Sequence, residues 1–166
     1  MTEITAAMVK ELREATAAGM MECKRALQEA DGDFDEAVKV LREKGMASAA
    51  KRADRATTEG KVGVMVRDNV GAIAAIGCET EPVSNNEDFL AYAEKLLTTV
   101  FDGGDPSSLE DERVALTAKL GENIQVVGSK RMQAADGELL SFYAHVPANK
   151  VGALVHTKGG DPAAGT

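Results

Sequence analysis

The stretch GKVGVMVRDNVGAIAAIGC, residues 60–78, decides the fold class of this chain. Its two halves, 60–66 and 71–78, are rich in Val and Ile, and Asp68-Asn69 between them forms a natural turn, so the stretch predicts a β-hairpin. The residues before it follow a helical period, and both helices and strands are expected after it. We therefore predict an α+β protein, in which an N-terminal three-helix bundle is followed by an antiparallel sheet packed with helices.

On the N-terminal side, three short helices are predicted over residues 4–45, because the apolar spacing and the turn residues agree. Thr5 is suited to cap the first helix, and Gly45 is expected to end the third. Residues 46–58 have high helix propensity but mostly alanine-sized apolar groups. The expected organisation is therefore a three-helix module at 1–45 and a helical linker at 46–58.

On the C-terminal side, an α+β core is expected at residues 59–158. The elements predicted beyond the first hairpin are helices at 86–100 and 109–120 and strands at 123–132, 138–145 and 151–156. Asp136-Gly137, between the first two of these strands, is a strong signal that they pair as a second hairpin. Residues 159–166 contain no large apolar side chain and are expected to form a flexible tail.

The charge and hydropathy of the chain argue against two classes of partner. The net charge of −8 disfavours general nucleic-acid binding, which requires Lys and Arg to neutralise phosphates. Residues 1–56 carry 10 basic and 11 acidic side chains, whereas residues 57–166 carry 9 and 16, so the acidic excess lies in the second part. No stretch approaches the roughly 18 to 20 consecutive apolar residues of a membrane span, and the N-terminus is charged where a signal peptide would be apolar. We expect a cytoplasmic protein that binds neither nucleic acid nor membrane.

No set of residues in the sequence forms a recognisable catalytic or metal site. Cys23 and Cys78 are the only cysteines and lie in unrelated contexts, so we expect two buried free thiols and neither a disulfide framework nor a zinc site. His145 and His156 are the only histidines, and no Ser-His-Asp, His-Glu-x-x-His or phosphate-loop pattern occurs. The expectation is a protein that grips another protein, without a catalytic site, metal or cofactor of its own.

Two adjacent methionines are the first feature that points to a protein partner. Met20 and Met21 lie about 100° apart on the predicted second helix, so they cannot both face the core of the bundle. Methionine is an adaptable contact residue, and Lys10, Arg13 and Lys24 can supply a basic rim around it. The alternative is that one methionine belongs to the core and the other has no role.

The segment CETEPVSNN, residues 78–86, is the second such feature. It joins a predicted strand to a predicted helix, and it carries the carboxylates of Glu79 and Glu81 beside the rigid ring of Pro82. A loop of this kind can project a fixed charge into another protein. The alternative is an ordinary helix entry that Asn86 caps.

Three stretches of the chain resemble one known family. Residues 4–38, ITAAMVKELREATAAGMMECKRALQEADGDFDEAV, are similar to the N-terminal module of bacterial translation elongation factor Ts, a ubiquitin-associated-type three-helix bundle. CETEPVSNNEDF at 78–89 resembles that family's Cys-x-Thr-Asp-Phe-Val segment, and LGENIQV at 120–126 resembles its Ile-Gly-Glu-Asn segment. The order and the separations of the three stretches agree with the family as well, and the resemblance covers nearly the whole chain.

The resemblance implies a guanine-nucleotide exchange factor that binds elongation factor Tu and releases its GDP. On this interpretation Thr80, Glu81, Pro82 and Val83 intrude near the Mg²⁺ site of the nucleotide and dislodge the ion. The positions that match the family's other contacts with elongation factor Tu are Lys10, Arg13, Met20, Met21, Lys24, Leu120, Gly121 and His145. Two alternatives remain: a non-catalytic interaction module that binds another partner, and a hydrolase that uses Glu79 and Glu81.

The chain departs from the family pattern in three respects. Glu81-Pro82 stands where the family commonly has Asp-Phe, so a small rigid ring replaces a large aromatic wedge. Ala17 stands where Gly is usual in the turn before Gly19, which should stiffen that turn. The chain also stops after the first strands of the second core subdomain, so we expect the coiled-coil insertion and the C-terminal module of longer relatives to be missing. Short relatives form homodimers, and a homodimer through residues 139–157 is a further expectation.

Overall fold

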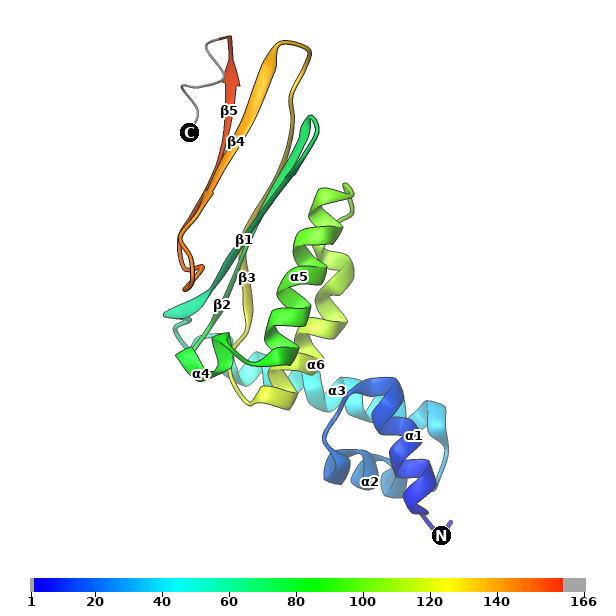
Figure 1. The fold of residues 1–166 in the computed structure, drawn as a ribbon. Helices are drawn as coiled ribbons and strands as arrows, with labels where there is room; N and C mark the ends of the chain where they lie inside the picture. Colours follow the sequence, from blue (N-terminus) through cyan, green and yellow to red (C-terminus); the bar gives the residue numbers. More distant parts are fainter. Residues whose placement is uncertain (1, 160–166) are drawn as a thin grey trace. The chain divides into compact units, whose positions relative to one another are not determined.

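The computed structural model describes residues 2–159, which fall into two compact units (Figure 1). The first unit combines the chain up to Arg55 with Asp111–Asn123, and the second combines Ala56–Glu110 with the residues from Ile124 onwards. The predicted α+β class, with N-terminal helices followed by antiparallel sheets, is confirmed. The grouping differs from the expected ranges in two respects: most of the helix at 110–120 clusters with the N-terminal helices, and most of the expected linker, residues 46–55, belongs to the first unit. The expected tail at 159–166 lies outside the described residues except for its first residue.

The first unit contains helices α1 (Ala6–Thr16), α2 (Met20–Glu29), α3 (Phe34–Arg52) and most of α6 (Glu110–Leu120). The predicted cap of α1 is confirmed, since the Met8 N–H donates to the Thr5 hydroxyl at 3.3 Å. The apolar faces of α1, α2 and α3 meet in one core, which is formed by Val9, Leu12, Cys23, Ala26, Leu27 and Ala37. Helical spacing of apolar residues therefore produces the three-helix bundle that the sequence predicted.

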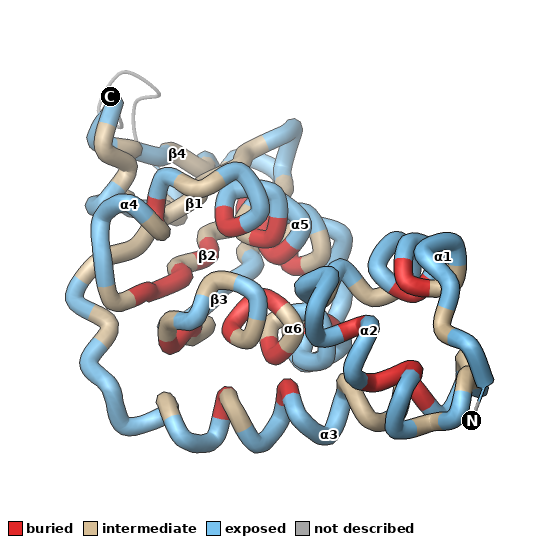
Figure 2. Tube along the Cα trace, turned by 90° about the horizontal axis from the view of Figure 1, so that it is seen from below, coloured by how far each residue is buried: buried red, intermediate tan, exposed pale blue. Residues whose placement is uncertain are grey.

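Gly45 does not end the third helix, so that expectation is wrong. Gly45 lies buried inside α3, which continues to Arg52 and takes in the first part of the expected linker. A Cβ atom at this position would come within 3.3 Å of Val114 Cγ1 in α6. Glycine costs a helix interior about 1 kcal/mol relative to alanine, but its missing side chain allows α6 to lie close to α3. Buried positions recur along α3 on this side of the helix (Figure 2).

The second unit is built on a sheet of three antiparallel strands, in the order β1 (Glu59–Arg67), β2 (Val70–Cys78) and β3 (Gln125–Gln133). The predicted hairpin at 60–78 is confirmed: Arg67 pairs with Val70, and Asp68 makes the turn with a φ of 51°. A short helix α4 (Glu81–Ser84) then leads into α5 (Glu87–Phe101), and a 3₁₀ helix η1 (Pro106–Leu109) precedes α6.

The two faces of this sheet are covered by different elements. On one face Leu97 of α5 packs against Gly63, where a Cβ atom would meet the leucine at 3.0 Å. On the other face lies a two-stranded ribbon, β4 (Glu138–Ala144) and β5 (Gly152–Lys158), whose Leu154 packs against Gly71. Side chains alternate between the faces of a strand, so small residues on both faces let a helix and a ribbon approach the same sheet.

The predicted second hairpin, between 123–132 and 138–145, is wrong. Asp136-Gly137 does lie in a turn, in which the Glu138 N–H donates to the Ala135 carbonyl at 3.0 Å. The strands on either side have other partners, however, because β3 pairs with β2 and β4 pairs with β5. A turn reverses the chain locally but does not decide which strands pair. β3 pairs along the edge of β2 that β1 leaves open, and it therefore does not form a hairpin with β4.

Both cysteines are buried free thiols, as predicted, and burial raises the pKa of Cys23. In the part of the chain that the structure describes, no helix has both the length and the apolar character needed to cross a membrane.

Candidate functional site

The two methionines of α2 are both at the surface. Met20 and Met21 are 59% and 62% exposed, so the alternative that one of them belongs to the core is wrong. Both lie in the first turn of the helix, and contact with the core begins one turn later, at Cys23. The turn itself is fixed by Gly19, whose N–H donates to the Glu22 carboxylate at 3.3 Å.

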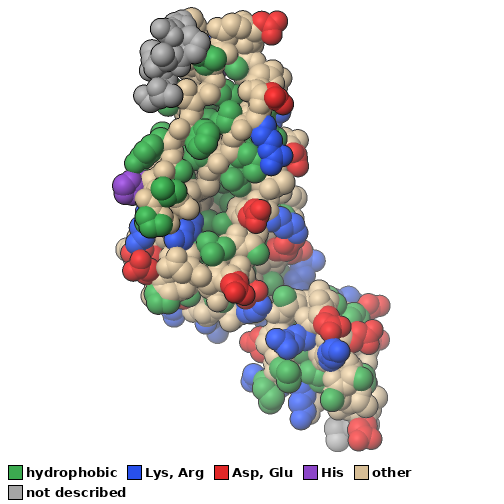
Figure 3. Space-filling model, in the orientation of Figure 1, with side chains coloured by type: hydrophobic (Ala, Val, Ile, Leu, Met, Phe, Trp, Pro, Cys, Tyr) green, Lys and Arg blue, Asp and Glu red, His purple; other side chains and the backbone are tan. Residues whose placement is uncertain are grey.

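The basic residues singled out by the sequence lie around these methionines. Lys10, Arg13, Met20, Met21 and Lys24, called the methionine patch below, all line one open depression of about 810 Å³. Hydrophobic and basic side chains also lie side by side on the visible face of the N-terminal helices (Figure 3). The patch is thus an adaptable apolar centre with a basic rim, on a chain whose net charge is −8.

Two other charged residues line the same depression. Glu14 forms a solvent-exposed ion pair with Lys10 at 3.7 Å, which is worth little because water screens it. Lys119 of α6 adds a further basic group. The sequence offered no signal for Lys119, because it is about a hundred positions away along the chain from the residues that it joins.

The residues Thr80–Val83, called the α4 segment below, form a short helical turn at the surface of the second unit. Thr80 is the N-cap, and Thr80, Glu81 and Pro82 are exposed while Val83 is half-buried. The turn is closed by Ser84, whose buried hydroxyl donates to the Glu81 carbonyl at 2.8 Å. Proline fits the first turn of a helix, where its missing N–H costs nothing.

The predicted cap of the next helix is present as well. The Asn86 side chain accepts hydrogen bonds from the N–H groups of Asp88 and Phe89 at 2.9 and 3.4 Å, and so caps α5. This cap was the alternative interpretation of the segment at 78–86. It does not bury the α4 segment, so the structure is compatible with both interpretations.

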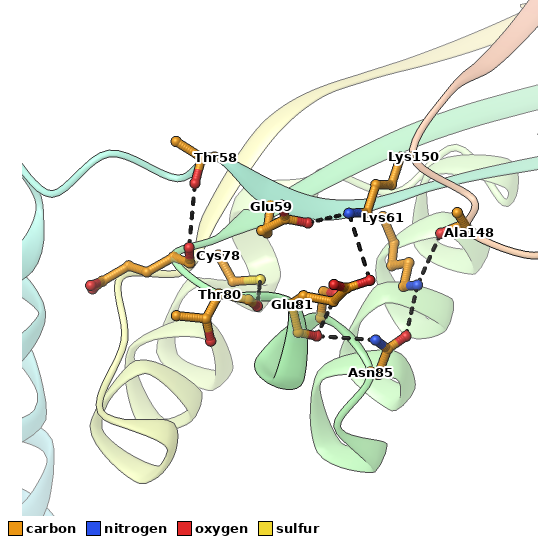
Figure 4. A network of polar contacts seen from close by, with 11 residues as sticks. Thr58, Glu59, Lys61, Cys78, Thr80, Glu81, Asn85, Ala148 and Lys150 are labelled. Atoms are coloured by element: carbon orange, nitrogen blue, oxygen red, sulfur yellow. Dashed lines mark hydrogen bonds and ion pairs between the residues drawn. The ribbon is translucent and has the colours of Figure 1, made fainter.

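A polar network joins the α4 segment to the loop between β4 and β5 (Figure 4). Lys150 Nζ lies 2.5 Å from Glu59 Oε2 and 3.8 Å from Glu81 Oε1. Lys61 Nζ donates to Asn85 Oδ1 and to the Ala148 carbonyl, both at 2.9 Å. Pairing with Glu59 raises the pKa of Lys150, so this side chain is cationic at neutral pH.

The three remaining candidates lie at chain reversals. His145 is exposed at the end of β4, and its Nδ1 atom is 2.7 Å from the Tyr143 hydroxyl. Leu120 and Gly121 end α6, where Gly121 takes a φ of 74° and its carbonyl accepts a hydrogen bond from Arg52 at 3.0 Å. The candidates are therefore divided between the units: the methionine patch, Leu120 and Gly121 belong to the first, and the α4 segment and His145 belong to the second.

The carboxylates give the hydrolase alternative little support. Glu81 faces Lys150, and among residues 2–159 no three His, Cys, Asp or Glu side chains are grouped so that they could hold a metal ion. Another close acid and histidine are Glu138 and His156, 2.7 Å apart on the β4–β5 ribbon. The Ala135 N–H and then His156 lower the pKa of Glu138 to about 2, which suits a permanently ionised structural acid rather than a proton donor.

Comparisons with known proteins bear directly on these features. The family model described as Elongation factor TS matches residues 79–165, which include the α4 segment and the β4–β5 ribbon. The protein named Elongation factor Ts from Thioalkalivibrio sulfidiphilus is 42% identical over 172 residues, covering 95% of this chain and 58% of that protein. Those from Cronobacter sakazakii and Escherichia coli are 42% and 41% identical over 167 residues, covering 97% of this chain and 57% of each relative.

This chain spans a little more than half the length of these relatives. The matched family model nevertheless covers more than half of the chain, and the identity extends through the N-terminal helices that carry the methionine patch. On this evidence the chain belongs to the elongation factor Ts family.

Proposed function

We propose that the chain is a guanine-nucleotide exchange factor of translation elongation, which binds elongation factor Tu in its GDP-bound form and promotes the release of GDP. Its relatives carry the name elongation factor Ts, which supports the proposal. The observation that carries it is the α4 segment, a short, internally hydrogen-bonded turn whose Thr80, Glu81 and Pro82 are exposed. A turn of this kind can enter a partner's site without first unfolding.

The proposed action needs neither a nucleophile nor proton transfer, so the chain would not be an enzyme in the chemical sense and would need no cofactor. A GTPase holds GDP through Mg²⁺ and through backbone donors of its phosphate loop, and a segment that displaces either one weakens nucleotide binding directly. The effect is reciprocal: the factor binds the nucleotide-free partner more tightly by the factor by which it weakens GDP. Each tenfold change in affinity requires about 1.4 kcal/mol of differential contact.

The residues of the α4 segment divide this work. Glu81 would bring a carboxylate toward the Mg²⁺ site. There the negative charge of the carboxylate would compete with the ion's own ligands for the ion. Pro82 would occupy the position of the family's aromatic wedge, with a smaller but rigid ring. Val83 is half-buried and would anchor the segment to the second unit. Because the Pro82 ring is smaller than a Phe ring, we expect this segment to enter the partner's site less deeply than an Asp-Phe segment.

Docking energy would come mainly from the methionine patch. Its exposed Met20 and Met21 offer apolar area to a partner, and Lys10, Arg13 and Lys24 favour an acidic surface around that contact. The remaining proposed contacts with elongation factor Tu are Leu120, Gly121 and His145. The factor would act with the translation machinery in the cytoplasm, with no need for nucleic acid or membrane as a partner.

The test is the release of labelled GDP from purified elongation factor Tu, followed over time at increasing concentrations of the chain. Faster release that saturates with concentration is the expected result. Unchanged release across a wide range of concentrations would refute the proposal. Binding to elongation factor Tu without any acceleration would favour the alternative of an interaction module, because that module has no role for the α4 segment.

We also propose that the β4–β5 ribbon mediates a homodimer through residues 139–157. Within the described residues each of its two strands pairs only with the other, and its exposed large apolar side chains are Leu139, Phe142, Tyr143, Val146, Val151 and Val155. An unpaired strand edge beside apolar side chains is a template for a second copy. Sedimentation equilibrium should show a dimer for the wild-type chain and a monomer for Phe142→Arg; a wild-type monomer at high concentration would contradict the proposal.

A further inference from the structure

Two lysines, Lys61 and Lys150, connect the α4 segment to the loop between β4 and β5, residues 145–151 (Figure 4). They come from different parts of the chain: Lys61 is the third residue of β1, and Lys150 lies near the end of that loop. Neither belongs to the α4 segment. We infer that Lys61 and Lys150 are positioning residues, which hold the α4 segment in the orientation that nucleotide release requires. This inference rests on the proposed function.

The α4 segment needs such support because its own helix is too short to hold itself. α4 contains four residues. A single helical turn is unstable in isolation, because fixing its backbone dihedrals costs more free energy than its first hydrogen bond contributes. Its internal hydrogen bonds close the turn but do not fix the direction in which the Glu81 side chain points. That side chain is 68% exposed, and it forms an ion pair outside α4 with Lys150 Nζ at 3.8 Å.

Lys150 supplies this contact and is itself held by the half-buried carboxylate of Glu59. The side chains of Glu59, Lys150 and Glu81 are 27%, 39% and 68% exposed, so the ammonium group links an inner carboxylate to an outer one. In the described part of the chain, Glu59 Oε2 is buried and has no hydrogen-bond partner beyond this ion pair. Removing the ammonium group would leave that carboxylate without compensation as well as freeing Glu81.

Lys61 holds the other end of the α4 segment. Its Nζ atom donates to Asn85 Oδ1, and the Asn85 side chain in turn donates to the Glu81 carbonyl at 3.1 Å. The second acceptor of Lys61 is the Ala148 carbonyl of the 145–151 loop. One ammonium group therefore fixes the end of α4 and the middle of the loop at the same time.

The 145–151 loop is itself fixed to the sheet. The Val62 N–H of β1 donates to the Asn149 carbonyl at 2.7 Å, and the Asn149 N–H donates to the His145 carbonyl at 2.8 Å. Because the loop is anchored in this way, the two lysines transfer its rigidity to the α4 segment. They also set the α4 segment relative to His145, the other proposed contact of the second unit.

Hydrogen–deuterium exchange of the chain alone tests the positioning directly. Lys150→Met and Lys61→Met keep the length of the side chain but remove its charge, and each should speed the exchange of amides 79–86 by about two- to fivefold. Lys150→Arg should restore wild-type protection. Lys158→Met is the matched control, because Lys158 of β5 pairs with Glu138 of β4 and does not reach α4. Unchanged exchange at 79–86 in both Met variants would overturn the inference, as would an equal increase throughout α5.

Release kinetics with elongation factor Tu test what the positioning is for. Lys150→Met should lower the maximal rate of GDP release by about threefold while leaving the half-saturating concentration unchanged, because docking through the methionine patch is intact. In a Glu81→Gln background the same substitution should have less than about half of this effect, since the lysine acts through that carboxylate. Equal effects in both backgrounds would overturn the inference.

The two experiments separate the two claims. A wild-type chain that leaves GDP release unchanged refutes the proposed function, whatever the lysine variants do. Amide exchange at 79–86 then still decides whether the lysines hold the α4 segment. A wild-type chain that releases GDP, with lysine variants that release it at the wild-type rate, refutes the positioning role alone.

Discussion

The turn between α1 and α2 allows a sharp test of backbone strain in the first unit. Ala17 has a φ of 54°, in the left-handed region, and its N–H donates to the Arg13 carbonyl at 2.8 Å. The left-handed conformation costs an L-residue about 1 to 2 kcal/mol, a cost that glycine avoids. Ala17 is exposed, so the substitution Ala17→Gly removes no buried contact, and the hydrogen bond is retained because only backbone atoms make it.

The gain in the folded state is partly offset in the unfolded state. A glycine gives the unfolded chain more freedom, which takes back about 0.4 to 1 kcal/mol. The difference spans about 0 to 1.6 kcal/mol, and we therefore expect Ala17→Gly to raise the free energy of unfolding by about 0.8 kcal/mol, the middle of that range. The expectation from the sequence, that alanine stiffens this turn, describes only the unfolded-state part of the balance.

Urea and thermal unfolding, followed by circular dichroism, would measure the difference. The matched control is Ala15→Gly, an exposed position inside the same helix, which should lower the free energy of unfolding by about 0.5 to 1 kcal/mol. Relative to the wild-type chain, the melting temperatures of Ala17→Gly and Ala15→Gly should shift in opposite directions. Each shift should be about 2 to 8 °C if the unit unfolds as a domain of this size. If both substitutions destabilise the chain by the same amount, the assignment of strain to Ala17 is refuted.

Three further predictions concern other parts of the chain. Replacing Met20 and Met21 together by Ala should weaken the complex with elongation factor Tu by about tenfold in a titration and leave the melting temperature unchanged, because both side chains are exposed. The Ala135 N–H, followed by His156 and Lys158, lowers the pKa of Glu138 from 4.5 to about 2, so the contribution of this carboxylate to stability is present above pH 4.5 and is lost as the pH falls toward 2; Glu138→Gln should remove this part of the acid dependence of the melting temperature. Gly45→Leu should lower the free energy of unfolding by about 1 to 3 kcal/mol in urea titrations, because its Cβ atom would already lie 3.3 Å from Val114 Cγ1 and would push α6 away from α3.

The candidate site could be predicted from the sequence only in part. The methionine patch and the α4 segment were named from local pattern and from resemblance, since a pair of adjacent methionines and a proline beside a carboxylate are visible in the sequence itself. Lys61 and Lys150 could not be found in this way. Each reaches the α4 segment from a distant part of the chain, and periodicity reports only which neighbouring residues share a face.

The sequence by itself determined most of the helices and strands and where several of them begin. Thr5 and Asn86 cap the helices that follow them, and Asp68-Asn69 closes the first hairpin, because these effects act over a few residues and need no distant partner. The tertiary structure decided everything that depends on a distant surface. Gly45 lies inside a helix because α6 lies against it, and β3 pairs with β2 despite the turn signal at Asp136-Gly137, since the burial and hydrogen bonding of a segment are fixed by partners that its own residues do not specify.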